Sequence, residues 1–306
     1  MKRTLPAHLL VGLALGLSLF SCRKSISSDA DKNSAGYDPS TYANNRPTLA
    51  VDTTREMPKV PFPQSVSTAC NYVPDYGDTI LYPQPGGSDY IVSPFNTPPA
   101  GKFYSWPAGM TIDSLTGAIN VTRSETGVRY VVGFVKAGTS DTCMTQLIIG
   151  GAAYMDSIYV VEQGQNAAKP YFNANALLQS ICGGNGCTFD VNNTAANANV
   201  IVDRLTGVID LQKTLNGTGL LGVGVFGLLP LNGQSVTVPV YYRLNDPSNN
   251  ALQHINLQFV YYYSKSQMQT GLILSILNKL TNAQNNKMVS TMANPRPPLI
   301  VIVRRP

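Results

Sequence analysis

A nine-residue segment occurs twice in the chain, 90 residues apart, and this repeat constrains the architecture more than any other feature. Residues 112–120 read IDSLTGAIN and residues 202–210 read VDRLTGVID, with five identical positions. In each copy the aspartate can hydrogen-bond the backbone that follows it, and the glycine supplies a positive φ, so each copy predicts a hairpin turn. The spacing is about what one small β-sandwich needs, so the repeat predicts two tandem modules.

The rest of the chain has the pattern of an all-β protein with a short helix near its carboxyl end. Turn-forming residues separate runs that are rich in β-branched and aromatic residues. Residues 268–280 carry apolar side chains at helical spacing instead, and a final apolar strand follows. We expect that last strand to pair within its own sheet, because an exposed edge this apolar would aggregate. The expected strands are 129–135, 144–149, 157–161, 236–242, 255–263 and 298–303.

One segment, Gly217 to Leu231, is unusually apolar and rich in glycine. Its Gly-x-Gly pieces lack the strand–loop–helix context, and the Lys followed by Ser or Thr, that a phosphate-binding loop requires. We therefore predict packed strand and turn there, and no phosphate site.

The first copy of the repeat resembles a motif of known proteins. Residues 107–119, PAGMTIDSLTGAI, are similar to the hairpin of the immunoglobulin-like (Ig-like) and cadherin-like repeats of bacterial surface proteins. The second copy has Asn199-Val200-Ile201 in place of the Pro-Ala-Gly lead-in. The resemblance implies two tandem Ig-like β-sandwich modules. Cadherins bind calcium between modules, but calcium needs six to eight converging oxygens, and the sequence shows no such acidic cluster, so no metal site is expected.

The amino end resembles that of bacterial lipoproteins. Lys2 and Arg3 precede an apolar run, residues 9–20, which is too short for a stable transmembrane helix but suits a signal peptide. The run ends at Leu19-Phe20-Ser21-Cys22, which is similar to the lipobox, although Phe20 stands where a small residue is usual. The resemblance implies that residues 1–21 are removed and that Cys22 carries the lipid.

These features divide the chain into four parts. The signal peptide is residues 1–21, and a flexible polar tether, residues 22–68, follows it. The first module is residues 69–164, and the second is residues 165–306 with the helix and the last strand. The resemblance points to a Bacteroidetes-type surface lipoprotein anchored in the cell envelope, and we expect the outer membrane.

Four cysteines remain after Cys22, in a compartment that permits disulfides. Cys182 and Cys187 flank a glycine-rich loop that can close on itself, which favours the pairs Cys182–Cys187 and Cys70–Cys143. Two other connectivities remain open from sequence alone. A zinc site is disfavoured because the spacing fits no zinc pattern and no histidine is near.

The net charge and the histidine content argue against nucleic-acid binding and against catalysis. Without Lys2 and Arg3 the chain has 20 basic and 17 acidic residues, too small and scattered an excess for nucleic-acid binding. His254 alone remains after the signal peptide, in an alternating strand pattern, so we expect no catalytic residues, no enzyme activity and no cofactor.

Two functions stay open. The first is a structural or interaction protein of the envelope, either an accessory subunit with a protein partner or an adhesin-type module. The second is a carbohydrate-binding surface lipoprotein of a polysaccharide-uptake system, with Tyr241-Tyr242 or Tyr261-Tyr262-Tyr263 as stacking faces. Alternate tyrosines of a strand point to opposite faces, so we expect most of them to line the core, and Trp106 too.

Overall fold

The computed structural model describes residues 70–86, 88–176, 179–182, 186–218, 222–284 and 297–306. The expected signal peptide, Cys22 and the tether to residue 68 lie outside these ranges. Strands dominate the described residues, and one helix longer than six residues accompanies them, as the all-β prediction required. Within these ranges no helix has the length and hydropathy to cross a membrane.

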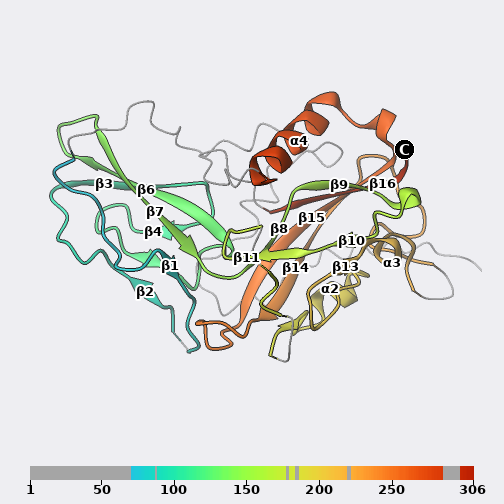
Figure 1. The fold of residues 1–306 in the computed structure, drawn as a ribbon, viewed down its shortest axis with the longest axis horizontal. Helices are drawn as coiled ribbons and strands as arrows, with labels where there is room; N and C mark the ends of the chain where they lie inside the picture. Colours follow the sequence, from blue (N-terminus) through green and yellow to red (C-terminus); the bar gives the residue numbers. More distant parts are fainter. Residues whose placement is uncertain (1–69, 87, 177–178, 183–185, 219–221, 285–296) are drawn as a thin grey trace, which may run out of the picture. The chain divides into compact units, whose positions relative to one another are not determined.

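The first part of the described chain forms two facing sheets (Figure 1). In the larger sheet, of order β1-β7-β6-β3, β1 is parallel to β7 and the other pairs are antiparallel. A smaller sheet, of order β2-β5-β4, contributes Ile119 to the core that Phe103, Tyr130 and Phe134 of the larger sheet form. The strand bounds are β1 Ile80–Leu81, β2 Ile91–Val92, β3 Gly101–Trp106, β4 Thr111–Ile112, β5 Ile119–Asn120, β6 Val128–Lys136 and β7 Thr142–Ile149.

The second part is built on a five-stranded sheet of order β12-β14-β15-β16-β9. Two short pairs, β10 with β13 and β8 with β11, share its core. The bounds are β8 Ala152–Tyr154, β9 Ser157–Val160, η3 Val161–Gln163, β10 Ala167–Ala168, β11 Pro170–Phe172, β12 Thr188–Phe189, α2 Thr194–Asn197, β13 Ile209–Asp210, α3 Leu211–Asn216, β14 Ser235–Arg243, β15 Gln253–Ser264, η4 Lys265–Gln267, α4 Thr270–Gln284 and β16 Leu299–Arg305.

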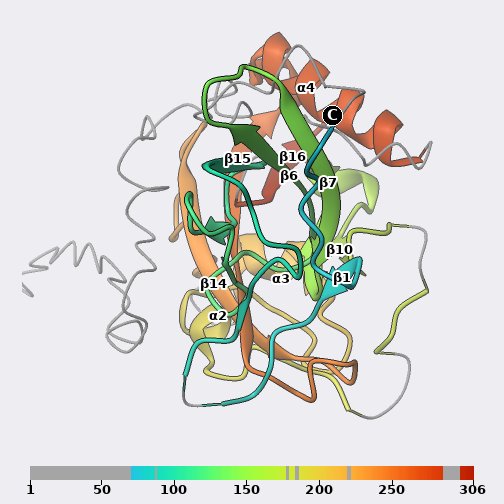
Figure 2. The same ribbon diagram turned by 90° about the vertical axis from the view of Figure 1, so that its left-hand side faces the viewer.

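Helix α4 covers one face of the five-stranded sheet, and the main core lies on the other (Figures 1 and 2). Successive residues of a strand point to opposite faces. On β16, Val301 therefore packs with Leu272 and Ile276 of α4, while its neighbour Ile302 enters the main core. Both faces of β16 are covered, which explains why its sequence is apolar without alternation.

The repeat predicted two equivalent turns, and the structure contains both. The carboxylate of Asp113 accepts the backbone N–H groups of Leu115 and Thr116, at 2.9 and 2.7 Å. Asp203 accepts those of the corresponding residues, Leu205 and Thr206, at 3.0 and 2.8 Å. Each turn is closed by a glycine with φ near +74° whose N–H donates to the aspartate carbonyl. The hairpin-turn prediction is confirmed in both copies.

The environment of the two turns is also duplicated. The Gly117 carbonyl accepts a hydrogen bond from the buried Tyr76 hydroxyl, and the Gly207 carbonyl accepts one from the buried Tyr154 hydroxyl. An aromatic ring packs against each glycine, from β3 in the first copy and from β12 in the second. The repeat therefore extends beyond nine residues, to a buried tyrosine and a phenylalanine in each copy.

The two copies differ in where their first strand pairs. In the first copy β1 pairs directly with β7, in parallel. In the second, β9 follows Tyr154 much as β1 follows Tyr76, but β16 lies between β9 and β15 and is parallel to both. The five-stranded sheet therefore takes in β9, which precedes residue 164, and the last strand of the chain pairs within its own sheet as predicted.

The other sequence-based predictions of elements have mixed outcomes. The five expected strands before the helix appear as β6, β7, β9, β14 and β15, and the expected helix appears as α4. The prediction for Gly217 to Leu231 is confirmed only in part. In its described residues a turn is present and Phe226 is buried, but no strand forms, and the pairing there is an isolated bridge between Gly224 and Gly227. Leu228, Leu229 and Leu231 are exposed there rather than packed.

The aspartates of the turns predict an acid-dependent loss of stability. Backbone hydrogen bonds, first from Thr116 and from Thr206, hold the pKa values of Asp113 and Asp203 below their ordinary value. A carboxylate whose pKa is lower in the folded state contributes stability above its unfolded pKa of about 3.9. That contribution is lost as the pH falls through the folded value. The free energy of unfolding, measured with urea, should therefore fall less for Asp113→Asn/Asp203→Asn than for the wild type between pH 7 and pH 3.

The asparagine variant is a matched test because its side-chain oxygen still accepts the two N–H groups but does not titrate. Equal losses of stability for the variant and the wild type between the two pH values would contradict this account.

Candidate functional site

The two disulfides expected from the cysteine spacing are present. Cys70 and Cys143 join the first described residue to β7, with 5.6 Å between their Cα atoms. Cys182 and Cys187 close the glycine-rich loop, with Cα atoms 5.4 Å apart. Within the described residues there is no group of three or more histidine, cysteine or acidic side chains placed to hold a metal ion.

The tyrosines considered as sugar-stacking faces are mostly core residues. Tyr242, Tyr261 and Tyr262 are buried, and so is Trp106. Tyr263 alone of the Tyr261-Tyr262-Tyr263 cluster is exposed, and the Arg305 guanidinium lies 4.9 Å from the centre of its ring. The expectation that most of these aromatics line the core is therefore confirmed.

His254 lies on β15 directly opposite Tyr241 of β14, with 5.5 Å between the ring centres. Its strand position agrees with the alternation in the sequence. The contact is aromatic packing across a strand pair, which is ordinary for a sheet surface.

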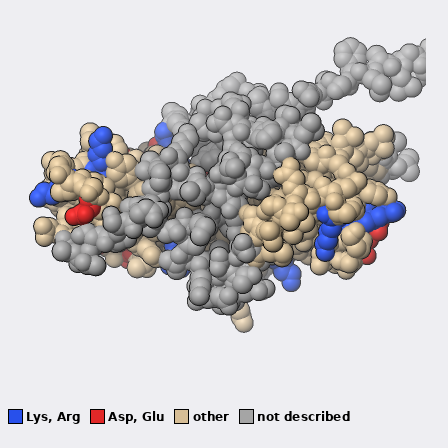
Figure 3. Space-filling view, turned by 90° about the horizontal axis from the view of Figure 1, so that it is seen from above, with Lys and Arg blue, Asp and Glu red and all other residues tan. Residues whose placement is uncertain are grey.

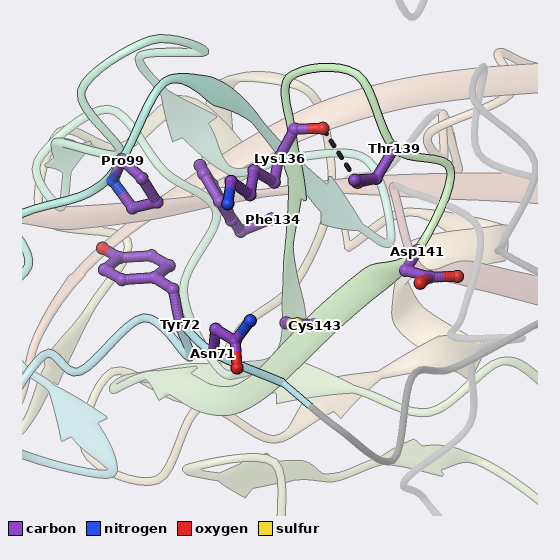
Figure 4. Close-up of a pocket in the computed structure, with 8 residues that line it drawn as sticks. All are labelled: Asn71, Tyr72, Pro99, Phe134, Lys136, Thr139, Asp141 and Cys143. Atoms are coloured by element: carbon purple, nitrogen blue, oxygen red, sulfur yellow. Dashed lines mark hydrogen bonds between the residues drawn. The ribbon is translucent and has the colours of Figure 1, made fainter.

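A different tyrosine lines a pocket beside the first disulfide. The pocket has a volume of about 280 Å³, just below the range of about 300–1,000 Å³ that is usual for ligand sites. Its wall comes from the segment after Cys70, from the end of β6 and from the start of β7 (Figure 4). The lining residues are Asn71, Tyr72, Pro99, Phe134, Lys136, Thr139, Asp141 and Cys143.

The ring of Tyr72 is held in place by aromatic neighbours. It packs edge to face on Phe134 at 4.7 Å and on Phe103 at 6.3 Å, measured between ring centres. Its hydroxyl donates to the carbonyl of Asn96 at 3.3 Å. Partial burial raises the pKa of the Tyr72 hydroxyl. Tyr72 is therefore a fixed, half-buried aromatic wall and not a mobile surface side chain.

Polar side chains of three kinds line the pocket: the amide of Asn71, the ammonium of Lys136 and the carboxylate of Asp141. In Figure 4 Asp141 lies at the opposite end of the pocket from the Tyr72 ring, with its carboxylate turned away from the ring. All three residues are exposed. The turn that separates Lys136 from Asp141 is fixed by Thr139, whose hydroxyl and N–H both bond the Lys136 carbonyl, at 2.9 and 3.1 Å. The pocket thus combines an apolar aromatic wall with donors and acceptors at its rim.

A second hollow, of about 670 Å³, lies beside the turn of the second repeat, between residues 166–167 and 201–213. Its polar groups bond one another: Asp210 and Lys213 form a salt bridge of 3.0 Å, and the Asn166 amide donates to Gln212 at 3.3 Å. No aromatic side chain is among the residues that line it. The pocket at Tyr72 is therefore the better candidate for a ligand site.

Sequence reasoning missed the pocket at Tyr72 because its parts are far apart in the chain. The nearest signal was the position of Asn71 and Tyr72 directly after Cys70, since the expected disulfide to Cys143 ties them to the edge of a strand. Pro99 and Phe134 then join them only through the fold of the first sheet.

Comparison with known proteins gives little further guidance. No family model matches the chain, and no curated protein matches it. Among solved structures, it is similar to a SusE-like, surface-located polysaccharide-binding protein from the heparin utilisation locus of Bacteroides thetaiotaomicron. The two are 10% identical, the match covers 58% of this chain and 87% of that one, and the TM-score is 0.20.

Proposed function

We propose that this protein is a non-catalytic carbohydrate-binding protein of the bacterial envelope, and that the pocket at Tyr72 holds the sugar. The observation that supports this most directly is the fixed tyrosine ring in a pocket with amide, ammonium and carboxylate groups at its rim. The apolar C–H face of a pyranose packs on an aromatic ring, and its hydroxyls take hydrogen bonds from groups of these kinds. The size suits one residue of a glycan whose remainder lies in solvent.

The lipid anchor at Cys22 completes the proposal, because a protein held at the cell surface meets polysaccharides before they enter. Cys22 lies outside the described residues, and this part of the proposal depends on the lipobox resemblance alone. An envelope protein partner fits the same anchor, but the pocket at Tyr72 is not needed for that function.

Substitution of the ring tests the site. In Tyr72→Leu, apolar packing on Phe134 is kept while the flat face is lost, so we expect glycan binding to weaken roughly tenfold, which is about 1.4 kcal/mol. The double variant Tyr72→Leu/Asn71→Ala should bind more weakly still, because it also lacks the amide that lines the pocket. Binding would be measured by calorimetry with the glycan that the wild-type protein selects from an array of plant, host and bacterial polysaccharides.

Tyr263→Leu is the matched control, because that tyrosine is exposed and lies on β15 of the five-stranded sheet, which contributes no residue to the pocket. It should bind like the wild type. The proposal fails if no polysaccharide binds the wild type, or if Tyr72→Leu and Tyr263→Leu bind equally well.

A further inference from the structure

Three leucines close together in the sequence are exposed on the surface of the second part of the chain. Leu228, Leu229 and Leu231 are 64%, 81% and 66% exposed, with only Pro230 between them. We call residues 228–231 the leucine loop. Single exposed leucines are common, but three within four residues form a contiguous apolar projection, which usually marks a contact with another apolar phase.

The base of the leucine loop is rigid, so its exposure is not a failure of the segment to pack. Phe226 is buried, and its ring lies 5.8 Å from that of Tyr261. The side chain of Gln234 spans the loop: its amide donates to the Phe226 carbonyl at 3.0 Å and its oxygen accepts the Leu231 N–H at 3.0 Å. The fold thus holds the leucines away from the core.

The chain around the leucine loop carries no charge over a long distance. From Thr214 to Tyr242 there is no Asp, Glu, Lys, Arg or His. Entry of the leucine loop into an apolar phase would therefore not require any ionised side chain to leave water, which is the largest cost of such a transfer.

Basic side chains lie next to this charge-free loop, at the end of β15 and β16. Asn232 accepts the Tyr263 N–H at 2.7 Å, and Arg305 lies over the Tyr263 ring, which places the loop beside the end of β16. Figure 3 shows lysine and arginine side chains gathered at the right of the view, with acidic side chains beside them. The cations of this region are Lys265, Arg304 and Arg305, and Glu162 pairs with Arg305.

We propose that the leucine loop inserts into the interface of an anionic phospholipid bilayer, as a second membrane contact besides the lipid at Cys22. Leucines at the tip of a projection, with cations beside them, are what a bilayer with acidic headgroups accommodates. A binding pocket on a partner protein would be expected to have a polar rim that forms hydrogen bonds, and the leucine loop has no polar side chain to pair with such a rim. An anchored chain would meet the bilayer at high effective concentration, so even a weak insertion would be populated.

A single fluorescent label tests this proposal on the mature, lipidated full-length protein. Four cysteines are in disulfides and Cys22 is expected to be acylated, so the cysteine of Leu229→Cys is the one thiol that should react. The protein, labelled with an environment-sensitive dye, is reconstituted into vesicles of phosphatidylethanolamine and phosphatidylglycerol that contain no other protein. The control is Leu205→Cys, because Leu205 is also highly exposed, at 60%, but lies on the second repeat turn.

We expect the dye at residue 229 to shift to the blue and to be quenched several-fold more by nitroxide-labelled lipid than the dye at residue 205. Iodide in the water should quench the two dyes in the opposite order. Equal iodide quenching at both residues would overturn the proposal. Protection of residue 229 from both quenchers would overturn it as well, because another segment or a second copy of the chain would then cover the leucine loop. Glycan binding is measured separately and does not bear on either outcome.

Discussion

Removal of the Cys70–Cys143 disulfide is expected to lower the free energy of unfolding by about 4 kcal/mol, because the bond closes a loop with a sequence separation of 73. Without it the unfolded chain regains the entropy of that large loop. For a folded body of this size the loss corresponds to a fall in Tm of roughly 8–16 °C. The measurement is thermal and urea unfolding of Cys70→Ala/Cys143→Ala.

The second disulfide provides the control. Cys182 and Cys187 are only five positions apart, so their removal as Cys182→Ala/Cys187→Ala should cost about 2 kcal/mol on the same entropic grounds. If the two double variants lose equal stability, loop closure does not explain what the first disulfide contributes.

The first disulfide also connects stability to the proposed site. Cys143 lines the pocket, and Cys70 holds the chain directly before Asn71 and Tyr72. The Cys70→Ala/Cys143→Ala variant should therefore bind glycan more weakly even at temperatures where it stays folded. The Cys182→Ala/Cys187→Ala variant should bind like the wild type.

Much of the fold could be predicted from the sequence because its signals are local. The turns at Asp113 and Asp203 follow from residues within five positions of each other. Helix α4 follows from a period of apolar residues, and the disulfides follow from four cysteines with one short, glycine-rich pairing.

What the sequence could not reveal depends on contacts between distant segments. The place of β16 between β9 and β15 is a choice among strand partners that a run of apolar residues leaves open. The pocket needs residues from three separate segments. The leucine loop is the clearest failure, because apolar composition predicts burial, whereas the fold leaves these side chains exposed and the bonds of Gln234 hold the two ends of the loop together.

The duplicated turns predict a second large effect, on substitution of their glycines. Gly207→Ala should lower the free energy of unfolding by about 3 kcal/mol, and Gly117→Ala by a similar amount. Each glycine has φ near +74°, where an alanine costs about 1–2 kcal/mol. The added methyl would also lie 2.6 Å from the ring of Phe189 or of Phe103, and overpacking of this kind adds about 1–3 kcal/mol.

Gly138 separates these two costs. Its φ is +79°, but nothing lies within 4 Å of the methyl that an alanine would add. Gly138→Ala should therefore show the conformational cost alone, about 1 kcal/mol, when the three variants are compared by urea unfolding. Equal losses for Gly138→Ala and Gly207→Ala would mean that the aromatic ring yields freely.

A double substitution identifies the ring as the cause of the remainder. Phe189→Leu replaces the ring that the new methyl at residue 207 would meet, and it leaves the backbone conformation of the turn unchanged. If the methyl does clash with the ring, Gly207→Ala should lower the free energy of unfolding less in the Phe189→Leu background than in the wild type. The double variant should then lose less stability than the sum of the losses of the two single variants. Strict additivity would instead assign the whole effect to the backbone, and the packing of Phe189 on the repeat turn would then be incidental to stability.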